Sequence, residues 1–70
     1  MRRSIQLTIN GEPHEVPADL TIDALVAHLG LIAVRVAVEQ NRRVVRRAEW
    51  MAQTVAAGDQ IEIVHFMGGG

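Results

Sequence analysis

The sequence predicts an α+β fold in which a mixed sheet of four to five strands is covered on one face by a single helix. Three observations indicate this fold: alternating segments around Asn10-Gly11, an amphipathic helical segment over 19–30, and an apolar, β-branched run over 61–67. One helix covers only one face of a sheet, so the other face is expected to stay open. The chain has 70 residues, 49% of them hydrophobic, which is enough for one small domain.

A β-hairpin is predicted at the start of the chain. Residues 4–10 alternate between apolar and polar side chains, which is the period of a half-buried strand. Asn10-Gly11 follows, and both residue types tolerate the positive φ of a two-residue hairpin turn. A second strand is predicted over 12–16, where two nearby prolines lack amide donors and favour a sheet edge.

The predicted helix has clear ends. Thr21 suits the N-cap, Asp23 places negative charge in the first turn, and Gly30 suits the left-handed position after the last turn. Four apolar residues fall on one stripe: Ile22, Leu25, Val26 and Leu29. A helix this short is stable only when it packs on another element, which the sheet supplies.

The second half of the chain contains the remaining strands. Residues 34–39 alternate as a third strand, and Asn41 is the residue best suited to positive φ in the turn that follows. A short strand is predicted at Val44-Val45.

A short helical turn is then predicted over 46–51, with Trp50 and Met51 covering a sheet edge. Gly58-Asp59 is the predicted turn into the last strand.

Composition and spacing argue against several kinds of function. Cysteine is absent, and His14, His28 and His65 lack the paired spacing of metal ligands, so we expect neither a metal site nor a catalytic residue. The net charge of −1 argues against a nucleic-acid binder. The sequence shows no membrane span or signal peptide, and we expect a cytoplasmic protein that is monomeric when free.

The glycine segment is the remaining chemical feature. We expect a domain over 1–67 and a flexible, slim tail over 68–70, whose Gly70 carboxylate an activating enzyme can reach. On the last strand, alternation places Val64 and Phe66 on the open face. With Met67 they form either a docking face for a partner or an apolar strand face covered by loops, and the residues alone favour neither alternative.

Several segments together form a recognisable family pattern: Asn10-Gly11-Glu12, Leu20-Thr21-Ile22, the segments 36–41, 44–50 and 58–64, and Gly68-Gly69-Gly70. The most discriminating part is the Arg47-x-x-Trp50 step. The pattern resembles the ThiS family of sulfur carriers in thiamine biosynthesis, which have the β-grasp (ubiquitin-like) fold. The chain departs from the family pattern at Arg42, where glycine is usual, and at Arg46, where proline is frequent.

The resemblance implies a carrier rather than an enzyme, with no bound cofactor. An adenylyltransferase of the ubiquitin-activating type would use ATP to activate Gly70, whose carboxylate then becomes a thiocarboxylate. A cysteine desulfurase would supply the sulfur, and thiazole synthase would receive it. Gly68 and Gly69 would lead Gly70 into the partner sites. The alternatives are a carrier for molybdopterin or another sulfur pathway, a ubiquitin-like protein modifier, and a non-covalent binding module.

Overall fold

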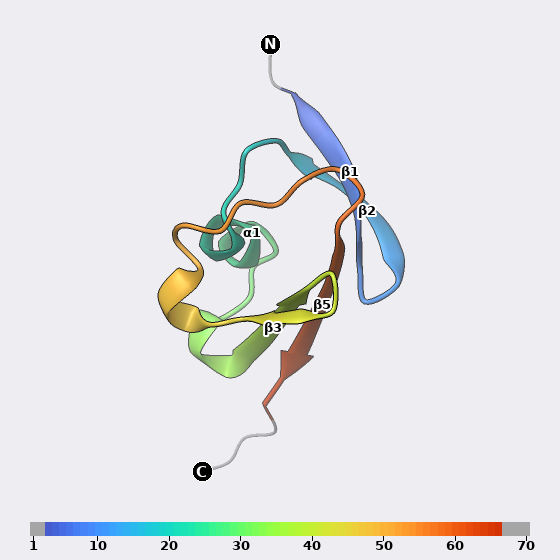
Figure 1. Cartoon of the computed structure of the whole chain (residues 1–70). Coiled ribbons are helices and arrows are strands. Elements are labelled where there is room, and N and C mark those ends of the chain that lie inside the picture. Colours follow the sequence, from blue (N-terminus) through green and yellow to red (C-terminus); the bar gives the residue numbers. More distant parts are fainter. Residues whose placement is uncertain (1–2, 67–70) are drawn as a thin grey trace.

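The computed structural model describes residues 3–66, in which one helix packs across one face of a five-stranded sheet (Figure 1). The strands are β1 (Ser4–Ile9), β2 (Glu12–Pro17), β3 (Val36–Gln40), β4 (Arg43–Val45) and β5 (Gln60–His65), and the helix is α1 (Ile22–His28). The predicted α+β fold is confirmed. Met67 and the glycine segment 68–70 lie outside the described residues.

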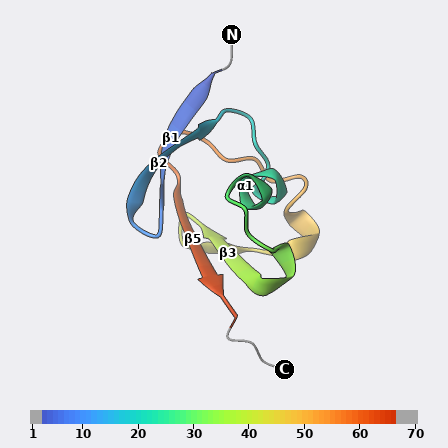
Figure 2. The same ribbon diagram turned by 180° about the vertical axis from the view of Figure 1, so that it is seen from behind.

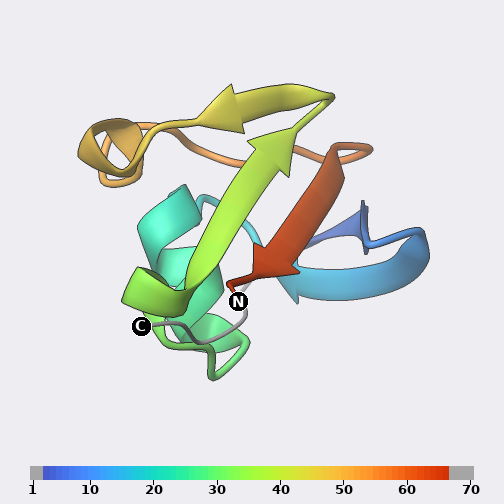
Figure 3. The same ribbon diagram turned by 90° about the horizontal axis from the view of Figure 1, so that it is seen from below.

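The last strand lies in the middle of the sheet. The strand order is β2-β1-β5-β3-β4, with β5 parallel to β1 and antiparallel to β3. Viewed from below, β5 lies between the β1–β2 hairpin and the β3–β4 hairpin, with α1 on one side of the sheet (Figure 3). The prediction that 12–16 forms an edge strand is also confirmed, since β2 is outermost.

The first hairpin turn also fastens β5. Asn10 and Gly11 have φ values of 52° and 83°, as the sequence predicts. The Asn10 amide donates to the Ile61 carbonyl at 2.8 Å. Its side-chain Oδ1 accepts from the Ile63 amide at 2.7 Å, and its Nδ2 donates to the Ile63 carbonyl at 3.2 Å. The Asn10 side chain therefore continues the short parallel pairing of β1 and β5 after β1 has turned away.

The second hairpin turn holds β5 from the other side. Asn41 has a φ of 54°, as predicted, and Arg42 has a φ of 70°. Asn41 Oδ1 accepts from the Gln60 amide at 2.9 Å, and the Asn41 amide donates to the Gln60 carbonyl at 2.8 Å. The start of β5 is thus bound by an asparagine from each hairpin.

Replacing Arg42 by glycine should stabilise the protein. A side chain in the left-handed region crowds the following carbonyl, and glycine relieves this but loses more backbone entropy on folding. We expect Arg42→Gly to raise the free energy of unfolding in urea by about 0.5–1 kcal/mol. Arg43→Gly is the matched control. Arg43 lies in β4, where glycine weakens a strand, so this change should lower the free energy of unfolding. Equal effects of the two changes would contradict this explanation.

The helix ends where its capping residues predict. Thr21 Oγ1 accepts from the Ala24 amide at 3.1 Å. Gly30 has a φ of 76°, and the amides of Gly30 and Leu31 donate to the carbonyls of the last helical turn at 3.0 and 3.1 Å. Ile22, Leu25 and Val26 are buried against the sheet. The view from behind shows α1 nearly end-on, on one side of β3 and β5 (Figure 2).

The third strand begins later than its alternation predicts. Residues Ala33–Arg35 form a 3-10 turn, η1, so the strand spans Val36–Gln40 and Val34 is 68% exposed. The chain must reverse direction between α1 and the sheet, and this turn uses residues whose local pattern favours a strand. The Phe66 amide donates to the Arg35 carbonyl at 2.9 Å, which ties η1 to the end of β5.

A second 3-10 turn, η2 (Arg47–Glu49), precedes Trp50, whose side chain lies in the core. Trp50 is 1% exposed, and its Nε1 donates to the Val45 carbonyl at 2.9 Å. The Arg47 guanidinium lies over the indole ring, 4.8 Å from its centroid. The expectation that Met51 helps to cover a sheet edge is wrong, because Met51 points outward and is 79% exposed.

Candidate docking face and its anchoring

The outer face of β5 is apolar at its end and accessible. Val64 is 57% exposed and Phe66 is 60% exposed, whereas Ile61 and Ile63 are buried against α1. Loops therefore leave these two side chains uncovered, which contradicts the second of the two alternatives that the sequence left open, an apolar strand face covered by loops. Their role in docking stays a prediction, and Met67, the third residue of the predicted face, lies outside the described residues.

Two further apolar residues belong to the loop that borders the end of β5. Ile32 is 58% exposed and Val34 is 68% exposed, and the bond from Phe66 to Arg35 brings this loop beside β5. Sequence reasoning missed both residues, because Val34 was placed in a strand and Ile32 carried no periodic signal. The apolar surface around the end of β5 is therefore wider than β5 alone.

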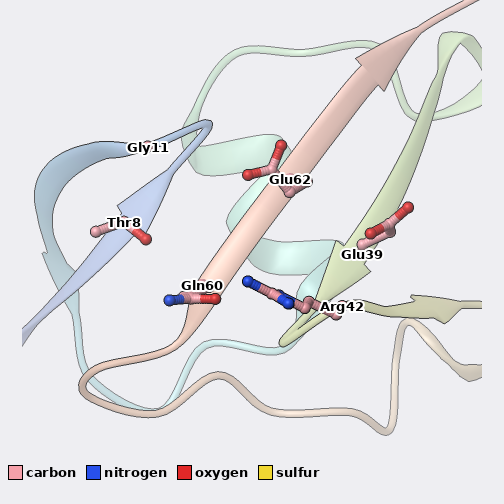
Figure 4. A pocket seen from close by; sticks show the side chains of 6 residues that line it. All are labelled: Thr8, Gly11, Glu39, Arg42, Gln60 and Glu62. Carbon is pink, nitrogen blue, oxygen red and sulfur yellow. The ribbon is translucent and has the colours of Figure 1, made fainter.

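Beside this apolar end, the open face carries a polar hollow of about 500 Å³. Figure 4 shows the side chains that line it, on the side of the sheet turned away from α1. They come from β1, both hairpin turns, β3 and β5: Thr8, Gly11, Glu39, Arg42, Gln60 and Glu62. Glu39 and Glu62 are directly opposed on β3 and β5. Like charges in this position repel each other.

The start of β5 is positioned by a buried carboxylate. Asp59 Oδ2 accepts from Gln40 Nε2 and from the Ala56 amide, both at 2.8 Å, and Oδ1 accepts from Asn41 Nδ2 at 3.0 Å. Burial raises the pKa of Asp59, but the hydrogen bonds from Asn41, Gln40 and Ala56 outweigh burial and lower its pKa below the ordinary value. Asp59 therefore stays ionised at neutral pH and holds the β4–β5 connection against β3.

Other chemical features are sparse in the part of the chain that the structure describes. Within residues 3–66, no three acidic or histidine side chains gather closely enough to hold a metal ion. His14, His28 and His65 lie on β2, α1 and β5. The helix of the described region is too short to cross a membrane.

Known proteins similar to this chain fall in one family. The model of the ThiS family matches residues 7–70. This chain belongs to the ThiS family. This membership confirms the resemblance predicted from the sequence. The matched residues include the Arg47-x-x-Trp50 step and the glycine segment 68–70.

Solved ThiS structures confirm the β-grasp fold. The crystal structure of the thiamine biosynthesis protein ThiS from Geobacter metallireducens is 39% identical, with a TM-score of 0.83 over 94% of this chain and 100% of that one. The solution structure of a thiamine biosynthesis protein from the same organism is 38% identical, with a TM-score of 0.78 over 94% of this chain and 88% of that one.

Two curated relatives are longer proteins. Thiazole synthases from Magnetococcus marinus and Paramagnetospirillum magneticum are 44% and 41% identical to this chain over 66 residues. The match covers 94% of this chain but only 20% of each synthase. The chain therefore spans about a fifth of these relatives.

Proposed function

We propose that this protein is the sulfur carrier of thiamine biosynthesis and that the Gly70 carboxylate carries the sulfur. The observation that supports this most is the ThiS family match, which runs to residue 70 and includes all three terminal glycines. The sequence contains no cysteine, so a thiol of this chain cannot hold the sulfur. A terminal carboxylate, once activated, can hold it as a thiocarboxylate.

In this proposal the protein is a substrate of its partners and not an enzyme. An adenylating enzyme of the ubiquitin-activating type brings the Gly70 carboxylate to ATP; a carboxylate oxygen attacks the α-phosphorus, and pyrophosphate leaves. A sulfur nucleophile then attacks the acyl carbon and displaces AMP. If a cysteine desulfurase supplies the sulfur as a persulfide, a second thiol must cleave the resulting acyl disulfide to release the thiocarboxylate.

Thiazole synthase is the proposed acceptor of the sulfur. The support is that two proteins named thiazole synthase contain a segment more than 40% identical to this chain. A donor held in the same chain as its acceptor has a high effective concentration, which explains why such a fusion is useful. A carrier that is not joined to its acceptor depends on its tail and its docking face for the encounter instead.

Intact-mass spectrometry tests this function directly. Incubated with ATP, Mg²⁺, sulfide and the adenylating enzyme of its own organism, the protein should gain the mass difference between one sulfur and one oxygen. Deletion of Gly70 should abolish the gain and leave the melting temperature unchanged, because residues 3–66 contain the whole described core. An unchanged mass, under conditions that modify a known ThiS protein, would overturn the proposal.

Three further assays separate the alternatives. Sulfur transfer to molybdopterin synthase but not to thiazole synthase would show a carrier for a different pathway. Conjugates to lysines of other proteins that disappear when Gly70 is deleted would show a protein modifier. Full biological activity without the tail would show a non-covalent binding module.

A further inference from the structure

We infer that the open face of the sheet docks on a basic surface of the adenylating enzyme, with a cationic side chain of that enzyme placed between Glu39 and Glu62. This inference rests on the proposed function and specifies the partner surface that activates the carrier. It concerns the hollow of Figure 4 and the apolar side chains beside it.

The first argument is the arrangement of the two carboxylates. Glu39 and Glu62 are nearest cross-strand partners on the exposed face of the two neighbouring strands β3 and β5. Opposed like charges destabilise a sheet, and an isolated domain gains nothing from them. A cation bound between them removes the repulsion and adds charge-assisted hydrogen bonds.

The second argument is that the protein itself neutralises this pair only in part. Arg42 extends from the β3–β4 turn towards β5 (Figure 4). Among the described residues, however, the one ion pair within 4.0 Å joins Arg3 to Asp19, far along the chain from the hollow. Two carboxylates and one guanidinium leave the hollow with a net negative charge. Its volume of about 500 Å³ leaves room for the end of a partner's arginine or lysine.

The third argument connects the hollow to the tail. Val64 follows Glu62 along β5 on the same open face, and the exposed Phe66 comes directly after the strand, so an enzyme that contacts this apolar end also meets the carboxylates. Residues 67–70 can span at most about 14 Å, so the enzyme surface must lie close to this face when Gly70 reaches ATP. A site that brings a carboxylate to a triphosphate needs cationic side chains, which makes the adenylating enzyme the complementary partner.

Charge variants with opposite effects on folding and binding test the inference. Glu39→Gln/Glu62→Gln should slow association with the adenylating enzyme of the same organism, in the presence of ATP and Mg²⁺, about tenfold at low salt. Its rate should also depend less on NaCl than that of the wild type. Glu62→Arg should slow association further, yet it should raise the melting temperature, because it creates an opposed pair with Glu39.

Two controls locate the effect. Glu12→Gln/Glu15→Gln removes the same charge from exposed positions on β2, about 10 Å away across the sheet, and should leave the rate unchanged. Phe66→Ala should speed dissociation without changing the salt dependence or the melting temperature.

Three outcomes would overturn the inference. The first is an equal decrease in the association rate for the β2 double variant and the Glu39→Gln/Glu62→Gln variant. The second is an unchanged association rate for both variants. The third is that Glu39→Gln/Glu62→Gln weakens binding to thiazole synthase but not to the adenylating enzyme. If the wild type is not adenylated at all, the proposed function fails instead, so the two failures can be told apart.

Discussion

Trp50→Ala is expected to lower the free energy of unfolding by about 3–5 kcal/mol, the usual cost of emptying a buried tryptophan site. Trp50 is 1% exposed and is among the largest fully buried side chains. A domain of 70 residues has a total stability of only about 4–10 kcal/mol, so the variant should be partly unfolded at 37 °C. Urea unfolding followed by far-UV circular dichroism measures the loss without needing tryptophan fluorescence.

Two matched variants separate the causes of this loss. Trp50→Phe keeps much of the apolar burial but removes the hydrogen-bond donor to the Val45 carbonyl. It also weakens the cation–π contact with Arg47, because phenylalanine is a poorer partner than tryptophan. This variant should cost about 1–3 kcal/mol. Met51→Ala alters the adjacent exposed side chain and should change stability by less than about 0.5 kcal/mol. Similar small losses for Trp50→Ala and Met51→Ala would contradict the role of Trp50 as a core residue.

Asp59→Asn is expected to cost about 1.5–3 kcal/mol at neutral pH, because it replaces a charged acceptor of three hydrogen bonds by a neutral amide. The side-chain NH₂ of the new asparagine would face another NH₂ donor, either Asn41 Nδ2 or Gln40 Nε2. Asp19→Asn is the control: Asp19 forms an exposed ion pair with Arg3, and its loss should be worth less than about 1 kcal/mol.

The effect of Asp59 should disappear in acid. Its pKa is lower in the folded protein than the ordinary value of 3.8, so the unfolded chain takes up the proton first as the pH falls. The contribution of the ionised carboxylate is complete above about pH 4 and declines as the pH falls through the depressed folded pKa. The difference in unfolding free energy between wild type and Asp59→Asn should therefore shrink as the pH falls from about 4 to strongly acidic values. A constant difference would mean that Asp59 acts through shape and not through charge.

Local signals in the sequence predicted the elements well, for physical reasons that can be named. Asn10-Gly11 forms the turn because both residues accept positive φ, and the chain leaves α1 through Gly30 for the same reason. Alternation along the last strand predicted the buried Ile63 and the exposed Val64. Each of these choices depends on residues that are close together in the chain.

Parts of the candidate site depend on residues that are distant in sequence, and these were not predictable. Asn10 marks a hairpin turn, and nothing local indicates that its side chain also binds Ile63. Val34 fits a strand until η1 turns it outward. Trp50 is an apolar residue in a short turn, and its burial follows from the path of 46–55 around the helix. The bond from the Val55 amide to the Leu20 carbonyl marks this path.

The sequence alone was sufficient for the class of fold, the succession of its elements and the resemblance to the ThiS family. Only the tertiary structure placed β5 between the two hairpins, and this placement opposes Glu39 to Glu62 and buries Asp59 among Gln40, Asn41 and Ala56. The physical reason is that strand pairing joins residues far apart in the chain. The pattern of a strand shows which side is apolar, but the neighbouring strand and its register follow from the packing of the whole domain.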